Sequence, residues 1–153
     1  MGNYFTISEL CYSDTAKEKG IDNTPPQSVQ VNLSLLIHHI LNPIRERYGY
    51  PIKVTSGYRC PALNAALKGS STSQHMTGEA ADLVPTGGRN DVGAIFRAAI
   101  AVGGYDQLIL EKPNTKSTGW VHVSYSAHQR RGQILYYNGN SYANIASNWQ
   151  QYV

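Results

Sequence analysis

The sequence has few cysteines, few charged residues and no long hydrophobic run, and each shortage excludes a class of protein. Its two cysteines, Cys11 and Cys60, are too few for a disulfide scaffold, and no CxxC spacing points to a structural zinc site or a redox motif. We interpret both as free thiols. No window approaches the roughly 20 consecutive apolar residues that cross a bilayer, which excludes a membrane-spanning protein.

Several common signals are also missing. The N-terminal residues lack the basic start and apolar stretch of a secretory signal, so we expect synthesis in the cytoplasm with no export signal. No HExxH helix, GxSxG turn, GxxxxGK loop or PCxxC deaminase motif is present, so nucleotide chemistry and a nucleic-acid partner are not expected. The formal charge of +3 is spread along the chain and favours an anionic polymer without choosing one.

What the chain does contain is enough to fold. Its 153 residues, 41% of them hydrophobic, fit one domain over residues 1–153. A chain of this size buries roughly two thirds of its surface, which allows a real core. Oligomeric state is not readable from the pattern, and we expect a monomer.

The hydrophobic pattern predicts helices and strands in separate groups. Apolar residues at spacings of three and four predict an amphipathic helix capped by Ser28 and kinked or interrupted at Pro43. A second helix is predicted from a cap at Asn90, and a last one over about residues 141–151. Short strands are predicted at residues 51–55, 80–84, 106–111, 120–125 and 133–137, the last three antiparallel. The class is therefore α+β, a small antiparallel sheet flanked by helices.

Two imidazoles and one carboxylate stand out as candidate metal ligands. His75 lies in a polar, glycine-rich loop, Asp82 lies on an apolar strand, and His122 alternates with two valines on a later strand. A buried carboxylate needs compensation, which a metal, an arginine or backbone donors would each supply. Three nitrogen and oxygen ligands with an open fourth position are what a catalytic zinc requires. The trio is the candidate site.

The stretches SGYRCPALN, SQHMTGEAAD, DQLILE and WVHVS, in that order, resemble the zinc D-alanyl-D-alanine carboxypeptidase family. That family includes cell-wall carboxypeptidases and phage endolysins that cut near L-alanyl-D-glutamate or D-alanyl links. The resemblance covers about residues 50–125 and implies a zinc site of His75, Asp82 and His122. It also implies an α+β fold shared with the signalling domain of Hedgehog proteins.

The sequence departs from the family at one point. Many members place a catalytic glutamate three residues before the last ligand histidine, where this chain has Gly119. In the members most similar to this chain, a glutamate ends the preceding strand at the position of Glu111. The resemblance thus implies Glu111 as the catalytic base, with Asp106 as the alternative.

The same resemblance implies one substrate contact, and residues near the candidate ligands are candidates for others. Arg59 would hold a carboxylate of the peptide, since a guanidinium fits a carboxylate with two hydrogen bonds. Ser73 and Gln74 would orient the substrate or the ligands, and Trp120 would wall the cleft.

The function implied is a zinc metallopeptidase acting on peptidoglycan peptides, which reaches the cell wall after phage- or lysis-type release. The cleaved bond, D-Ala-D-Ala, L-Ala-D-Glu or a cross-bridge, stays open, as does phage or bacterial origin. The alternative is a non-catalytic cell-wall or protein-binding module that keeps the fold, with or without the zinc, because a fold alone does not settle function.

Overall fold

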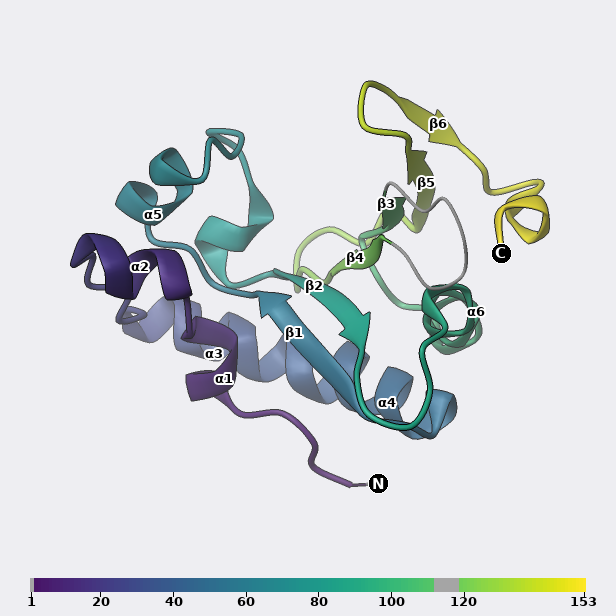
Figure 1. Cartoon of the computed structure of the whole chain (residues 1–153), viewed down its shortest axis with the longest axis horizontal. Helices are drawn as coiled ribbons and strands as arrows, with labels where there is room; N and C mark the ends of the chain where they lie inside the picture. The colour runs from purple at the N-terminus through teal and green to yellow at the C-terminus, as the bar shows by residue number, and fades with distance from the viewer. Residues whose placement is uncertain (1, 112–118) are drawn as a thin grey trace.

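A six-stranded mixed sheet forms the centre of the molecule (Figure 1). The computed structural model describes residues 2–111 and 119–153. The strands lie in the order β1-β2-β4-β3-β5-β6, and all neighbours are antiparallel except β3 and β5. Their bounds are β1 Ile52–Ser56, β2 Ala80–Pro85, β3 Gln107–Glu111, β4 Trp120–Ser124, β5 Gln133–Tyr137 and β6 Tyr142–Asn144. The predicted α+β class is confirmed.

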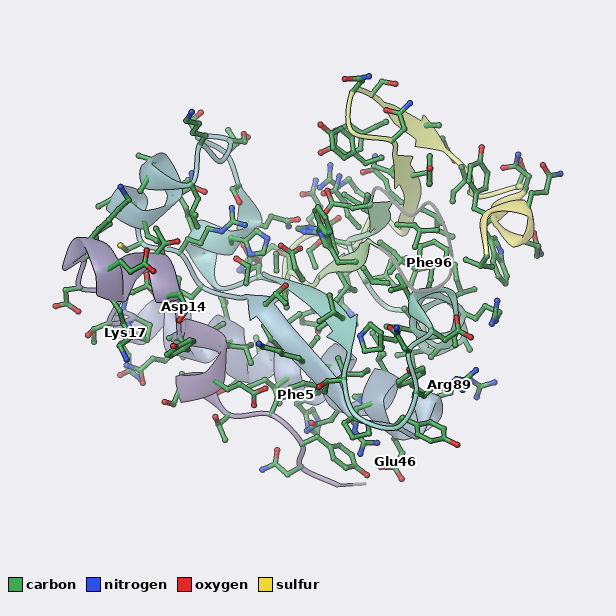
Figure 2. All side chains as sticks on the ribbon, in the orientation of Figure 1. Phe5, Asp14, Lys17, Glu46, Arg89 and Phe96 are labelled. Carbon is green, nitrogen blue, oxygen red and sulfur yellow. The ribbon has the colours of Figure 1, made fainter. Side chains whose placement is uncertain are left out.

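Helices cover one face of this sheet and enclose the core. The bounds are α1 Ile7–Cys11, α2 Asp14–Lys19, α3 Gln27–Leu36, α4 Asn42–Tyr48, α5 Pro61–Ala66 and α6 Val92–Val102. Figure 2 shows Phe96 on α6 beside the sheet, while Glu46 and Arg89 lie at the periphery. Inward side chains of α3, α4 and α6 share one apolar cluster with alternate residues of β2, β3 and β4.

The long amphipathic helix is interrupted where Pro43 requires it. A proline cannot donate the backbone hydrogen bond of a helix, and its ring clashes with the carbonyl four residues earlier. A π-helical turn at Ile37–Leu41 accommodates the proline. At its end, the backbone N–H of Asn42 donates to the carbonyl of Ile37, five residues earlier. The helix then restarts as α4, so the expected interruption is present. The expected cap at Ser28 is wrong, since the helix begins at Gln27 after Pro26 without a side-chain cap.

The predicted antiparallel arrangement of the last three strands is correct for β3 and β4 and wrong for β5. Strand β5 runs parallel to β3, with Glu111 opposite Tyr137. The reason lies in the crossover from β4. Asp106, just before β3, accepts hydrogen bonds from the backbone N–H of Arg131, and its own carbonyl accepts from the N–H of Gln133. The returning chain is therefore anchored at the start of β3, and β5 must begin there.

The predicted C-terminal helix over residues 141–151 is also wrong. Residues Tyr142–Asn144 form β6, which pairs with β5, and only Trp149–Tyr152 form a 3-10 turn. Ile145 is buried in the core, and its backbone N–H donates to the carbonyl of Ile134, which ties the segment to the sheet. The cap of α6 is Asp91, whose side chain accepts from Ala94 N–H, and not Asn90.

Alternation along the strands gives the sheet two unlike faces. In β4, Val121 and Val123 are fully buried against the helices, as the sequence predicted, while Trp120 and His122 point to the other side. That other face is polar and carries the site described next. Among residues 2–111 and 119–153, each helix is too short or too polar to cross a membrane.

Candidate metal centre and cleft

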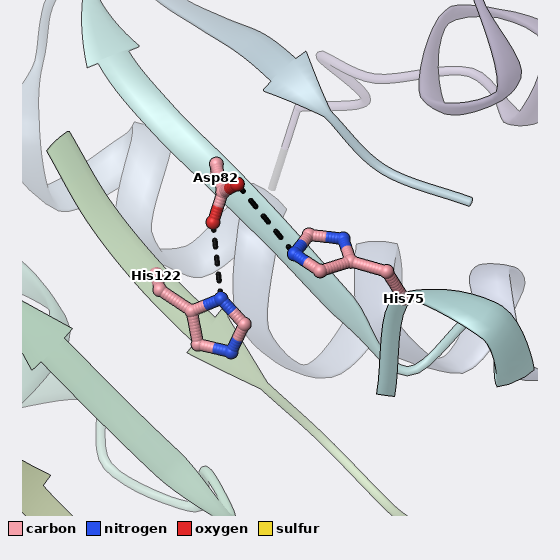
Figure 3. A group of neighbouring side chains, drawn as sticks. All are labelled: His75, Asp82 and His122. Carbon is pink, nitrogen blue, oxygen red and sulfur yellow. Dashed lines mark hydrogen bonds and ion pairs between the residues drawn. The ribbon is translucent and has the colours of Figure 1, made fainter. Parts of the chain in front are cut away.

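His75, Asp82 and His122 converge from three segments (Figure 3). His75 comes from a 3-10 turn, Gln74–Thr77, and the other two residues are direct cross-strand partners on β2 and β4. His122 Nδ1 lies 3.0 Å from Asp82 Oδ1, and His75 Nε2 lies 3.5 Å from Asp82 Oδ2. One ligand atom from each residue lies within 4.8 Å of the others. The three residues are therefore placed to share one metal ion.

The turn that carries His75 is fixed from both ends. Ser73 Oγ accepts the backbone N–H of His75, and Gly78 closes the turn with φ of 75°. A Cβ at Gly78 would come within 2.8 Å of a methyl group of Val29, so both the positive φ and the space require glycine. The expected loop is thus an ordered turn that points His75 at the sheet.

The tautomer of His75 suits a metal ligand. Its Nδ1 lies 2.7 Å from the carbonyl oxygen of Gly57, and because a carbonyl only accepts, Nδ1 must carry the proton. The lone pair of the neutral ring is then on Nε2, which faces Asp82. Metal-ligating histidines usually donate their other N–H in this way, which fixes ring orientation. The donor set of two imidazoles and one carboxylate, held this way, fits a zinc ion.

The electrostatics of His75 and Asp82 support the same interpretation. Burial lowers the pKa of His75, which keeps its ring neutral and available as a ligand. Burial alone would raise the pKa of Asp82, but the hydrogen bond from His122 and the nearby imidazole of His75 hold that pKa well below its usual range. For His122 burial would lower the pKa, and the bond to Asp82 raises it instead. The carboxylate is therefore ionised.

Arg59 lies beside this trio. Its Nη2 is 3.7 Å from Asp82 Oδ2, its Nε donates to Ser56 Oγ at 2.9 Å, and its backbone N–H donates to the carbonyl of His75. The guanidinium faces the cleft from the β1 side. Arg59 therefore places a positive charge in the cleft next to the trio.

An open cleft of about 800 Å³ runs along this face of the sheet. Glu111, Trp120, Ser73 and Gln74 line it together with Arg59 and the metal-site trio, so the structure brings all eight predicted site residues into one cleft. Trp120 Nε1 donates to Glu111 Oε2 across β3 and β4. Burial, followed by the charge of Asp82, raises the pKa of Glu111. A carboxylate with a raised pKa holds a proton more readily than a solvated glutamate, which suits a group that exchanges protons.

Asp106, the alternative base, is differently placed. Its side chain is fully buried and accepts both an Arg131 Nη2 bond at 2.8 Å and a Gln74 Nε2 bond at 2.9 Å. The pKa of Asp106 is lowered, mainly by its hydrogen bond from the guanidinium of Arg131. Both oxygens of Asp106 already accept hydrogen bonds, and the residue does not line the cleft. Asp106 therefore holds the β5 crossover and the side chain of Gln74 in place. Of the two candidate bases, Glu111 is the one that lines the cleft.

The cleft also contains residues that the sequence reasoning missed. Lys68 lies on its α5 side, and Arg131, Tyr137 and Tyr142 on its C-terminal side. Tyr137 and Tyr142 could have been found by continuing the alternation from Glu111 across the sheet. That required knowing that β5 is parallel and that residues 142–144 are a strand. Both cysteines are free, as interpreted from the sequence.

Comparison with known proteins gives one result. The family model described as Peptidase M15 matches residues 3–124, which include the metal-site trio, Arg59 and Glu111. The match ends before β5 and β6. No curated protein matches the chain significantly.

Proposed function

Because this chain belongs to the peptidase M15 family, we propose that it is a zinc peptidase that hydrolyses amide bonds in peptidoglycan peptides. The family supports a metallopeptidase. The observation that carries the proposal is the convergence of His75, Asp82 and His122 beside Glu111 in one open cleft. The family resemblance stated above supports the choice of peptidoglycan.

The proposed ligands are His75 through Nε2, Asp82 through its carboxylate and His122 through its ring nitrogen. When bound there, zinc would supply a Lewis acid that acidifies a water molecule and polarises a carbonyl. Gly57 would keep His75 in the required tautomer through its carbonyl.

Glu111 would act as the general base and then the general acid. Its carboxylate would take a proton from the attacking water and deliver it to the departing amine of the peptide. Trp120 Nε1–H, which donates to Glu111, would hold the carboxylate in place during this exchange. The raised pKa of Glu111 makes it a stronger base than a solvated glutamate.

Arg59 would bind a carboxylate of the peptide and align the scissile carbonyl. Ser73 and Gln74 would shape the cleft wall next to His75. Ser73 would do so by accepting a hydrogen bond from the backbone N–H of His75, and Gln74 is held by its hydrogen bond to Asp106. Trp120 would form the cleft wall on β4.

We further propose that the protein acts as a monomer on the cell wall after release by lysis. The net charge of +3 supports approach to an anionic polymer. D-Ala-D-Ala, L-Ala-D-Glu and cross-bridge links are the candidate bonds.

The proposal is tested by digesting purified peptidoglycan with the zinc-loaded protein, with and without a chelator, and weighing the products by mass spectrometry. New peptide ends that vanish with chelator and return with added zinc are expected. Unchanged peptidoglycan in the presence of zinc would overturn it. The product masses identify the bond.

One variant distinguishes the proposed peptidase from the alternative, a binding module that keeps the zinc. Glu111→Gln should reduce turnover at least about a hundredfold, the usual contribution of a general base, while zinc stays bound. A binding module would show no turnover in either form and would still sediment with peptidoglycan.

A further inference from the structure

A row of side chains leads from the metal centre to the C-terminal edge of the sheet. On the cleft face, Trp120 is the cross-strand partner of Glu111, Glu111 of Tyr137, and Tyr137 of Tyr142. The four residues thus lie side by side across β4, β3, β5 and β6. Tyr137 and Tyr142 line the same cleft as the metal-site trio. Their strands lie outside the segment that matches the peptidase family.

The two tyrosine rings form a fixed platform. Their centroids are 4.5 Å apart and their planes are inclined by 33°. Tyr137 is half-buried and its hydroxyl donates to the carbonyl of Gly139, so its ring is held by the turn between β5 and β6. Tyr142 rests on it and keeps 58% of its surface exposed. One face of an aromatic ring is therefore offered to the cleft without needing to be ordered by the ligand.

Tyr142 is also within electrostatic reach of the catalytic side of the cleft. Partial burial and then the charge of Glu111 raise the pKa of its phenol. Because Tyr142 lies two strands from Glu111 and lines the same cleft, a group bound on the platform would be a near neighbour of the bond that Glu111 acts on. Amide side chains of Gln107 and Gln129 line the cleft as well, and they offer hydrogen bonds to hydroxyl or acetamido groups.

The chemistry of the platform selects among the parts of peptidoglycan. The face of an aromatic ring carries partial negative charge and favours C–H groups that carry partial positive charge. Stem peptides built from alanine and glutamate offer only methyl groups and short methylene chains beside charged and amide groups, and these cover little of a ring. A pyranose has one face of several parallel C–H bonds, which matches a ring in size, and polar groups at its rim.

We propose that Tyr137 and Tyr142 form a saccharide subsite, in which a pyranose of the glycan strand stacks on Tyr142. This inference rests on the proposed function and deepens it, because it makes the substrate a peptide that is still linked to sugar. The C-terminal strands β5 and β6 then supply recognition, and the part that matches the family supplies the metal centre.

The position of the platform also bears on which bond is cleaved. Two strand spacings separate β3 from β6, which is about 10 Å. The first amide bond between stem residues lies one residue and a lactyl link from the sugar, roughly 8 Å along an extended chain. A terminal D-Ala-D-Ala bond lies at least three residues further, which adds about 10 Å. A sugar on Tyr142 thus brings the L-Ala-D-Glu bond to Glu111.

The test compares two substrates and three variants of the zinc-loaded full chain. One substrate is a disaccharide-linked stem peptide, and the other is the same peptide released from its sugar and acetylated at its amino end. Tyr142→Ala should lower kcat/KM about tenfold on the sugar-linked substrate and less than twofold on the free peptide. Tyr142→Trp should keep the preference for the sugar-linked substrate.

Tyr152→Ala is the matched control. Its ring stacks on Tyr136, on the opposite face of β5, with centroids 4.7 Å apart. It should leave kcat/KM unchanged on both substrates. Equal losses on both substrates with Tyr142→Ala, or no loss on either, would overturn the subsite.

A binding measurement separates failure of the subsite from failure of the proposed function. The glycan disaccharide without peptide is titrated into the zinc-loaded protein while the tyrosine ring signals are followed by NMR. Shifts at Tyr142 that disappear in Tyr142→Ala support the subsite even if no peptide is hydrolysed. No shift at millimolar disaccharide overturns it even if hydrolysis is found.

Discussion

The two faces of the central sheet have different roles, although adjacent residues of the same strands form them. One face packs in the core, and the other carries the candidate metal site. On β2, Leu83 is fully buried among the helices, and its neighbour Asp82 points into the cleft between two imidazoles. On β4, Val121 and Val123 face the core on either side of His122. Since side chains alternate along a strand, the helical layer holds the backbone while the other face is free to carry chemistry. The comparison predicts that stability and metal binding are separable at a spacing of one residue.

The largest effect is expected on the cleft face. Asp82→Asn replaces an ionised ligand with a neutral amide, so metal affinity should fall at least about a hundredfold. Hydrolysis of peptidoglycan peptides should fall at least about a thousandfold, because the metal and the alignment of both histidines are lost together. Competition with a chromophoric chelator and initial rates measure the two quantities. Metal binding with wild-type affinity in this variant would remove Asp82 from the site.

The neighbouring residue should show the opposite behaviour. Leu83→Ala leaves a cavity in the apolar cluster and should lower the free energy of unfolding by about 3 kcal/mol. The folded molecules should bind zinc with unchanged affinity, because Leu83 does not reach the cleft. Urea denaturation and chelator competition together check this. A loss of affinity comparable to that of Asp82→Asn would show that the two faces are not independent.

Gly57 is the position at which one substitution should lower both the stability and the metal affinity. A Cβ there would lie 2.2 Å from the carbonyl oxygen of Leu10, whose hydrogen bond from Tyr58 N–H joins α1 to the end of β1. The carbonyl of Gly57 also orients His75. Gly57→Ala should therefore cost about 2 kcal/mol of stability and about tenfold in metal affinity at once.

The control for Gly57→Ala is Gly88→Ala. A Cβ at Gly88 meets only the ring of Tyr50, at an ordinary contact distance of 3.7 Å. Neither stability nor metal affinity should change measurably. If Gly57→Ala altered stability alone, the orienting role of its carbonyl would be refuted.

The smallest change in stability is expected for Asp106, which lies behind the cleft. Asp106→Asn weakens the bonds to Arg131 and Gln74, and should lower stability by about 1.5 kcal/mol at neutral pH. The folded pKa of Asp106 is lowered, so its contribution is present above the unfolded value of about 4 and is lost as pH falls through the folded pKa. The gap between wild type and variant should shrink below about pH 4 in urea denaturation. A gap independent of pH would mean that the carboxylate charge is not the cause.

Local patterns in the sequence predicted the elements that have a strong periodicity. The spacing of Val29, Leu33 and Leu36 identified the main helix, because burial of one face imposes that spacing. The alternation around His122 placed it opposite the core for the same reason. The candidate ligands were chosen by residue type and resemblance, and the structure brings them within one cluster.

The C-terminal segment could not be predicted in the same way. Residues 141–151 have apolar spacings that fit a helix, yet Ile145 pairs its backbone with β5 and Tyr142 joins the sheet. The direction of β5 depends on the anchor between Arg131 and Asp106, which are far apart in sequence. Contacts of this kind leave no local signal, so the platform of Tyr137 and Tyr142 was not foreseen.

The sequence by itself determined which faces of the main helix and of the central strands are buried and which types of ligand are available, because amphipathic burial and residue chemistry are encoded in local spacing and side-chain type. Only the tertiary structure decided that His75 turns its Nε2 toward Asp82, that Glu111 and not Asp106 faces the cleft, and that two tyrosines extend it. These outcomes depend on backbone partners distant in the chain, such as Gly57 for His75 and Arg131 for Asp106. Their positions are set by packing of the whole sheet on its helices, which no short stretch of sequence contains.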